Sequence, residues 1–340
     1  MYTLCMDLDL YRYEVRVSTN PLVHGATSLL RFGREETKMI INRLSYVLIL
    51  TMSVMLVSLT ACAAGSTAPE MTSIPPTLVA SQTVMPIPTE PQPTATAKTN
   101  AALNGDFEVN GHSLYMACVG TGAPTIVLEP GEGGTVSDMF DLQEKLGMRT
   151  TTCAYDRAQT GSSRSAQDIV NDLHALLDTA QVPGPYLLVG HSAGGMFVQL
   201  YARTYPDQVV GVLAMNPVPP AHPWLDEVSK LFSVQEYADE EAYYNGQNGE
   251  SLDYLTSSEQ VVAAPMPPDI PFEMLISTSA QCEDSTGPCM KSYPAYEKIM
   301  QEVTAAWPHG NFSQVATSHE IFRDDPDAVV TIVERILASK

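Results

Sequence analysis

The segment 190–194, Gly-His-Ser-Ala-Gly, is the feature that most limits how this chain folds. An apolar run typical of a buried strand, 186–189, leads into it, and a run typical of a helix, 195–202, follows. The chain must therefore bend sharply at Ser192, and a glycine two residues to either side removes the side chains that would clash there. The bend presents the serine hydroxyl beside a helix N-terminus, which favours developing negative charge. The pattern predicts a nucleophilic serine.

A glycine-rich turn between a strand and a helix can also hold a phosphate group. The Lys-Ser/Thr pair of a phosphate-binding loop does not follow this turn, and its glycines do not have the spacing of a dinucleotide fingerprint. We therefore interpret Ser192 as a nucleophile, and we expect the protein to need no organic cofactor.

Apolar runs of strand type alternate with helical patterns from residue 104 to residue 340. In the helical segment 168–177, apolar residues share one stripe, and Asp325 followed by Pro326 is a helix start. This alternation predicts an α/β fold with a mostly parallel sheet and helices on both faces. The expected strands are 107–109, 114–119, 125–128, 151–155, 186–189, 210–215, 272–277 and 312–316.

The chain from about residue 114 onward resembles the α/β-hydrolase superfamily, close to esterase-like members with a Gly-His-Ser-x-Gly-Gly turn. Besides this turn, three segments match the layout of that superfamily in the same order: 125–134, 155–163 and 318–327. The resemblance implies an eight-stranded, mostly parallel sheet in one domain, 104–340. It also implies a catalytic triad in the chain order serine, acid, histidine.

The general base that activates Ser192 is expected at His319. This histidine follows the last predicted strand and precedes the final helix, so it lies on a loop at the carboxyl end of the strand. His309 comes before that strand, and His222 lies in a long insertion. The alternative for His319 is an ordinary histidine of a surface loop.

The third member of the triad is expected after the seventh strand, where Asp284 is our choice and Glu283 the rival. Each could equally be a solvated loop carboxylate. Some relatives place the acid after the sixth strand, but this chain has Asn216 there, which cannot carry the charge that stabilises an imidazolium.

The oxyanion of a tetrahedral intermediate needs two backbone N–H donors. The resemblance assigns one to Ala193, directly after the nucleophile, and the other to Glu132, with Gly131 as an alternative. The carboxylate of Glu132 must point away from the oxyanion, because two negative charges so close together would repel each other.

The connection between the sixth and seventh strands, about 217–271, is too long for a plain loop, and it is predicted to form a lid over the site. Its aromatic residues could line a substrate pocket, but for most of them packing within the insertion is the favoured interpretation. They are Trp224, Phe232, Tyr237, Tyr243, Tyr244 and Tyr254.

Residues 1–61 are interpreted as an N-terminal extension and secretion signal. The run 44–61 carries no charge and follows Lys38 and Arg43, which is typical of a signal segment. Met39 would make a more ordinary start. The alternative for 44–61 is an uncleaved transmembrane anchor, because its length is near the lower limit for a membrane-spanning helix.

The residues directly before Cys62, Leu-Thr-Ala, resemble a bacterial lipobox, in which the cysteine thiol is lipidated. The segment 62–103 is rich in Pro, Thr and Ala and is expected to act as an extended tether. We therefore expect the domain to lie outside the cytoplasm, anchored by lipid to the outer face of a bacterial membrane.

Four cysteines remain in the predicted domain, and an even number in an exported domain permits disulfides. By the strand order that the resemblance implies, Cys118 and Cys153 lie on neighbouring strands, and Cys282 and Cys289 are close in sequence. We expect these two pairs. A zinc site is not expected, because Cys-x-x-Cys pairs and a His-Glu-x-x-His motif are missing.

These patterns predict a hydrolase that cleaves a small carboxylic ester through an acyl-enzyme, without a metal. The same triad would serve amide or peptide cleavage, and a lipoprotein that only binds a ligand is a further alternative. A nucleic-acid partner is excluded by the formal net charge of −21, because phosphates would be repelled.

Overall fold

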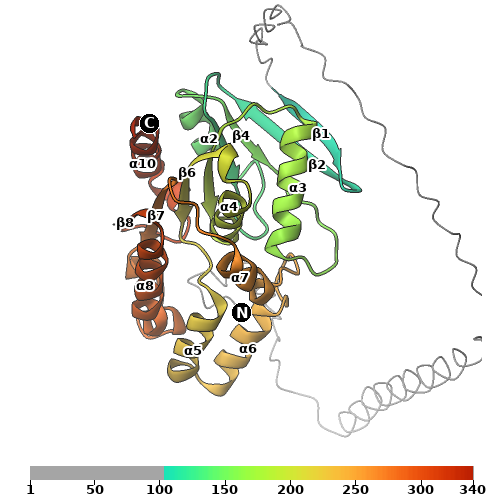
Figure 1. Ribbon diagram of the computed structural model, residues 1–340. Helices are drawn as coiled ribbons and strands as arrows, with labels where there is room; N and C mark the ends of the chain where they lie inside the picture. The colour runs from blue at the N-terminus through green and yellow to red at the C-terminus, as the bar shows by residue number, and fades with distance from the viewer. Residues whose placement is uncertain (1–102, 340) are drawn as a thin grey trace, which may run out of the picture. The chain divides into compact units, whose positions relative to one another are not determined.

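A computed structural model describes residues 103–339 of the chain (Figure 1). These residues form the predicted α/β domain. The predicted signal segment 1–61, the lipidation of Cys62 and the tether up to residue 102 lie outside the described residues. Within 103–339, no helix combines the length and the apolar character needed to cross a bilayer.

The domain is organised around one eight-stranded sheet with the strand order β1-β2-β4-β3-β5-β6-β7-β8. The first two strands pair antiparallel, β2 pairs antiparallel with β4, and every later pairing is parallel. The strands are β1 Asn104–Val109, β2 His112–Val119, β3 Thr125–Glu129, β4 Thr152–Tyr155, β5 Tyr186–His191, β6 Val209–Met215, β7 Pro271–Ser277 and β8 His309–Val315.

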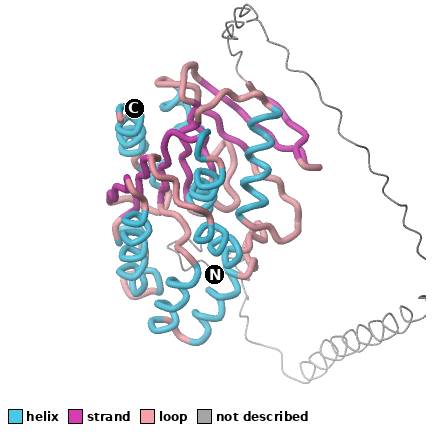
Figure 2. The backbone as a smooth tube through the Cα atoms, viewed as in Figure 1, coloured by secondary structure: helices cyan, strands magenta, loops and turns pink. Residues whose placement is uncertain are grey.

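Both faces of the sheet are covered, and Figure 2 shows helices flanking the strands. Successive residues of a strand point to opposite faces, so Val127 and Leu188 join one apolar cluster while Ile126 and Leu187 join the other. The central strands are therefore apolar on both faces, as the sequence predicted. The first cluster is completed by α3 Ala166–Thr179, α4 Ala193–Thr204 and α8 Pro288–Ala306, and the second by α2 Phe140–Gly147, α9 Ile321–Asp324 and α10 Pro326–Ala338.

The start of the last helix follows the predicted capping pattern. The side chain of Asp325 accepts a hydrogen bond from the backbone N–H of Ala328 at 3.0 Å, and Pro326 occupies the first turn. The predicted apolar stripe of this helix is buried, and Val329, Val333 and Ile336 belong to the second apolar cluster. The local sequence therefore determines where α10 begins after the loop that holds His319.

The insertion between β6 and β7 folds into helices α5 Ala221–Leu231, α6 Val234–Tyr244 and α7 Tyr254–Ala263. They lie together at one end of the domain (Figure 1). Its aromatic residues are mostly inside: Trp224, Tyr244 and Tyr254 are among the largest fully buried side chains. The indole N–H of Trp224 donates to Glu240 at 2.6 Å. These aromatic residues therefore pack inside the insertion, as the favoured interpretation predicted.

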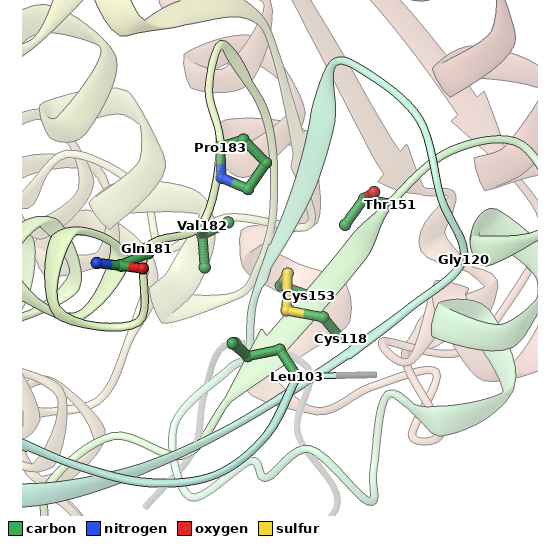
Figure 3. A pocket seen from close by; sticks show the side chains of 8 residues that line it. All are labelled: Leu103, Cys118, Gly120, Thr151, Cys153, Gln181, Val182 and Pro183. Atoms are coloured by element: carbon green, nitrogen blue, oxygen red, sulfur yellow. A yellow bond between two sulfur atoms is a disulfide. The ribbon is translucent and has the colours of Figure 1, made fainter. Parts of the chain in front are cut away.

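Both predicted disulfides are present in the structure. Cys118 and Cys153 are direct partners in the antiparallel pairing of β2 and β4, and Cys282 is linked to Cys289 at the start of α8. Figure 3 shows the first disulfide beside a cavity of about 30 Å³. The cavity also contacts Thr151, just before β4, so it lies at the amino ends of the parallel strands, away from Ser192.

We expect the disulfide between Cys118 and Cys153 to stabilise the domain more than the other one, because it closes a loop of 35 residues instead of 7. Replacing both Cys118 and Cys153 by Ala should lower the free energy of unfolding by about 2–4 kcal/mol. Urea denaturation measures this change, with the Cys282→Ala/Cys289→Ala protein as the matched control. A greater loss in the control would contradict the loop-length argument.

Candidate functional site

Ser192 lies at the bend between β5 and α4, at the carboxyl end of the parallel strands. Its backbone has φ 52° and ψ −118°, a conformation that non-glycine residues rarely adopt. Hydrogen bonds hold this bend: the N–H of Ser192 donates to the carbonyl of Met215 at 2.9 Å, and the carbonyl of Ser192 accepts from Gly195 at 3.0 Å. The predicted sharp turn therefore exists, and it holds the serine in one orientation.

The glycines that flank Ser192 are required by close backbone packing. A Cβ atom at Gly190 would lie 2.3 Å from the carbonyl oxygen of Gly194, and one at Gly194 would lie 2.2 Å from that of Glu129. Atoms cannot approach so closely, so any side chain at either position would force the bend open. The Gly-x-Ser-x-Gly spacing in the sequence is thus explained by the space available to each backbone.

His319 lies on the loop between β8 and α9, at the same end of the sheet as Ser192. Its backbone carbonyl contacts Nε2 of His191 at 3.1 Å, and the two imidazole rings are 4.7 Å apart between centroids. Because His191 directly precedes the serine, this contact brings the histidine loop to the bend. His319 is 9% exposed, and its Nε2 has no hydrogen-bond partner among the described residues.

The loop that carries His319 is held through its backbone. The side-chain amide of Asn216, at the carboxyl end of β6, donates to the carbonyl of His319 at 2.9 Å. The same side chain bonds Ser277 at the end of β7, and the hydroxyl of Ser277 donates to the carbonyl of Ser318 at 2.6 Å. Sequence reasoning rejected Asn216 as an acid and missed this bracing. The position of Asn216 directly after a central strand was the signal that could have indicated this role.

Burial lowers the pKa of His319 well below its usual value of 6.5, and the neighbouring ring of His191 lowers it further. His191 is also buried, and burial lowers its pKa as well. Both rings are therefore neutral at pH 7. A neutral imidazole is the form that can accept a proton from a serine hydroxyl.

The structure does not bring Asp284 to His319. Asp284 is fully exposed, and its carboxylate accepts hydrogen bonds from the backbone N–H and the hydroxyl of Thr286, both at 2.8 Å. These bonds lower the pKa of Asp284. The rival Glu283 is exposed as well. The loop after β7 thus turns its acids toward solvent, a direction that depends on loop conformation and that sequence spacing does not specify.

Backbone N–H groups suited to an oxyanion lie on both sides of Ser192. Ala193 is the first residue of α4, where the N–H has no intrahelical acceptor. On the other side, a Cβ added to Gly131 would lie 3.2 Å from Cβ of Ser192, so the loop after β3 packs against this serine. Glu132 follows in this loop, and its N–H has no acceptor among the described residues.

The side chain of Glu132 is directed to the insertion. Its carboxylate accepts hydrogen bonds from the hydroxyls of Tyr243 at 2.8 Å and Tyr254 at 3.0 Å, and from the N–H of Gly249. These three donors hold the negative charge of Glu132 at the contact between its loop and the insertion.

A cavity of about 140 Å³ lies beside Ser192. It is smaller than the roughly 300–1,000 Å³ typical of pockets for drug-sized ligands. Its wall is largely polar, and none of the aromatic residues of the insertion lines it. The lining residues are Pro130, Gly131, Glu132, Gly133, Gly134, Asp138, Met139, His191, Ser192, Glu320, Phe322 and Arg323. Across residues 103–339, no group of three or more His, Cys, Asp or Glu side chains is arranged to hold a metal ion.

Comparisons with known proteins agree with this architecture. Residues 124–254 match the family described as alpha/beta hydrolase fold. The uncharacterized protein YqjL of Bacillus subtilis (strain 168) is 33% identical over 108 residues, which are 29% of this chain and 41% of that protein. The chain therefore spans less than half the length of this curated relative.

Among solved structures, an esterase from Thermogutta terrifontis is 14% identical with a TM-score of 0.48, over 69% of this chain and 98% of that one. An enol-lactonase from Burkholderia xenovorans LB400 is 19% identical with a TM-score of 0.48, over 69% of this chain and 100% of that one. Similarity at this level does not extend to substrates. The predicted fold class is confirmed by the family match together with the mostly parallel eight-stranded sheet: the domain has the α/β-hydrolase fold.

If His319 is the general base that the sequence predicts, the pH dependence of hydrolysis should follow the lowered pKa of this histidine. A base acts only when it is neutral, so kcat/KM should fall as the pH drops through this pKa, and the midpoint of that fall should lie below 6.5. Measuring kcat/KM from pH 4 to pH 8 with a neutral ester tests this. A midpoint above 6.5 would show that a negative charge acts on the ring.

From the geometry we expect Asp284→Asn and Glu283→Gln to keep kcat/KM within about threefold of the parent, while His319→Ala abolishes turnover. In a serine protease triad, Asp→Asn lowers kcat by about 10⁴. A drop of that order in only one of the two variants would identify that carboxylate as the triad acid and would mean that the loop rearranges when substrate binds.

Proposed function

We propose that this protein is a serine hydrolase that cleaves a small carboxylic ester through an acyl-enzyme. The observation that carries the proposal is the strained bend at Ser192, which the loop of His319 reaches through His191 and against which the loop of Gly131 packs. The proposed nucleophile, base and oxyanion donors therefore belong to segments at the same end of the sheet.

In the proposed reaction, Oγ of Ser192 attacks the ester carbonyl carbon while His319 takes the hydroxyl proton. The carbonyl oxygen becomes an oxyanion, which the N–H groups of Ala193 and Glu132 stabilise. The intermediate collapses, and the C–O bond to the alcohol breaks as His319 returns the proton to it. A water molecule then repeats the sequence on the acyl-enzyme, releasing the acid and restoring the serine.

The proposal does not include the orienting role that the sequence assigned to Asp284, because this carboxylate is bonded to Thr286 in its own loop. Within the structure, the bonds of Asn216 and His191 to the carbonyl of His319 support the position of the His319 loop instead. Such bonds fix the backbone but supply no negative charge to the imidazolium that forms during the reaction. The proposed enzyme would therefore rely on the position of the base and on the oxyanion donors.

The size of the cavity favours substrates with short acyl groups. A volume of about 140 Å³ beside Ser192 suits a short acyl group, and the surrounding Asp138, Glu320 and Arg323 favour a polar substituent. Amide or peptide cleavage is the second candidate within the same chemistry, because the same nucleophile and base would serve it. A protein of this fold that only binds a ligand is the alternative outside catalysis.

We further propose that the domain works outside the cytoplasm as a lipoprotein anchored through Cys62. The disulfides of the domain support this location, because such bonds persist in oxidising compartments and are rare in the cytosol. The lipid on Cys62 would make the membrane its partner, with the segment 62–103 as the spacer. Mass spectrometry of the membrane-extracted protein tests for a diacylglyceryl group on Cys62.

The function is tested with a fluorophosphonate probe and with p-nitrophenyl esters of increasing acyl length on the purified full chain. We expect labelling and turnover in the parent protein, a preference for the shortest esters, and loss of both in Ser192→Ala. Ser229→Ala, a change at an exposed serine of α5, is the matched control and should behave like the parent.

A parent protein that neither takes the probe nor turns over any ester would favour the ligand-binding alternative. Labelling by the probe together with turnover of p-nitroanilides, but not of esters, would favour amide cleavage.

A further inference from the structure

The loop that supplies the second oxyanion donor is tied to the insertion by two crossed glutamates. Glu250 of the insertion accepts a hydrogen bond from the N–H of Gly133, and Glu132 of the loop accepts one from the N–H of Gly249. Each carboxylate thus binds the backbone of the other segment. The insertion and the loop therefore share one set of contacts, and the position of one depends on the position of the other.

Arg157 lies beneath this contact and is 5% exposed. Its guanidinium binds both oxygens of Glu250, at 2.7 Å and 3.0 Å, and Oε1 of Glu129 at 2.8 Å. The second oxygen of Glu129 accepts from the hydroxyl of Tyr155 at 2.6 Å. Burial works against the charge of Arg157, but the carboxylates of Glu250 and Glu129 outweigh it and raise its pKa. The arginine therefore stays charged, and carboxylates hold it from two sides.

The same guanidinium also binds the backbone of the loop after β3, residues 130–134, which carries the proposed second oxyanion donor. It donates to the carbonyl of Pro130 at 2.6 Å and to the carbonyl of Gly131. A trans peptide unit is planar, and its N–H points opposite to its C=O. Because the carbonyl of Gly131 faces Arg157, the N–H of Glu132 in the same peptide must face the other way. By the same reasoning, the carbonyl of Pro130 fixes the direction of the Gly131 N–H.

We propose that Arg157 is the positioning residue of the oxyanion hole, and that Glu250 makes the insertion part of this support. The inference rests on the proposed function, since it assigns the direction of the donors that stabilise the oxyanion. Arg157 does not touch the substrate. It turns the peptide planes on either side of Gly131 so that both candidate N–H groups face away from the buried charges, along a loop that packs against Ser192.

The test replaces Arg157 by Lys, which keeps the charge but cannot bind two carbonyls and two carboxylates in one plane. Arg164→Lys is the matched control. Arg164 is a buried arginine in the same loop between β4 and α3, and it pairs with Asp172 and the carbonyl of Ala158 without contacting residues 129–133. The thermal unfolding midpoints of both variants measure how much stability is lost when a buried arginine is replaced by lysine.

For Arg157→Lys we expect kcat to fall about 10- to 100-fold, since full loss of one oxyanion donor costs about 10²–10³ in kcat. KM should stay within about threefold of the parent, because ground-state binding does not need the donors. A trifluoromethyl ketone that forms a hemiketal oxyanion with Ser192 should lose affinity by the same factor as kcat. Arg164→Lys should change neither quantity by more than about threefold.

Glu250→Gln provides a second variant should Arg157→Lys fail to fold. We expect a smaller loss, about three- to tenfold in kcat and in ketone affinity. The amide removes one negative partner of the guanidinium, but Arg157 can still bind the carbonyls of Pro130 and Gly131. Glu259→Gln, at an exposed carboxylate of α7 that pairs with His222 on the surface, is its control.

The inference would be overturned if each variant had the same kcat and ketone affinity as its control. It would also be overturned if KM rose while kcat stayed unchanged. Absence of fluorophosphonate labelling in the parent protein would instead refute the proposed function, so the two failures are distinguishable.

Discussion

The rest of the site depends on the absence of side chains at Gly190 and Gly194. The backbone of the bend passes so near to β3 that the carbonyl oxygen of Glu129 occupies the place where a Cβ on Gly194 would lie. This approach puts Ser192 against the loop that follows β3, which carries the N–H groups proposed as oxyanion donors. The strained φ of 52° at Ser192 is maintained because sheet and helix hold the chain on both sides.

The sheet and the bend at Ser192 could be predicted because their signals are local. Strands buried on both faces are apolar at every position, as in Leu187, Leu188 and Val189, and such runs are recognisable wherever they occur. The bend at Ser192 is equally local, since its glycines and its flanking elements are contiguous. The place of His319 could be predicted because the order of elements along the chain limits which histidine reaches the carboxyl end of the sheet.

The partners of these residues were harder to predict, because they depend on loop conformation and on distant segments. The side chain of Asp284 turns to Thr286 in its own loop, a choice that no spacing rule determines. The support of the His319 loop by Asn216 is a hydrogen bond to a carbonyl, and every residue has a carbonyl. The ion pairs of Arg157 join residues 28 and 93 positions away, so no local pattern marks them.

The disulfide between Cys118 and Cys153 has a mechanical consequence. The chain enters the described domain at residue 103, directly before the edge strand β1, and β1 pairs with β2 alone. A pull on the preceding segment would therefore peel β1 away from β2 one hydrogen bond at a time. The covalent link between β2 and β4 would stop this unzipping at the second strand. The disulfide would then bear the tension, and β3 and β5, which carry the candidate site, would stay paired.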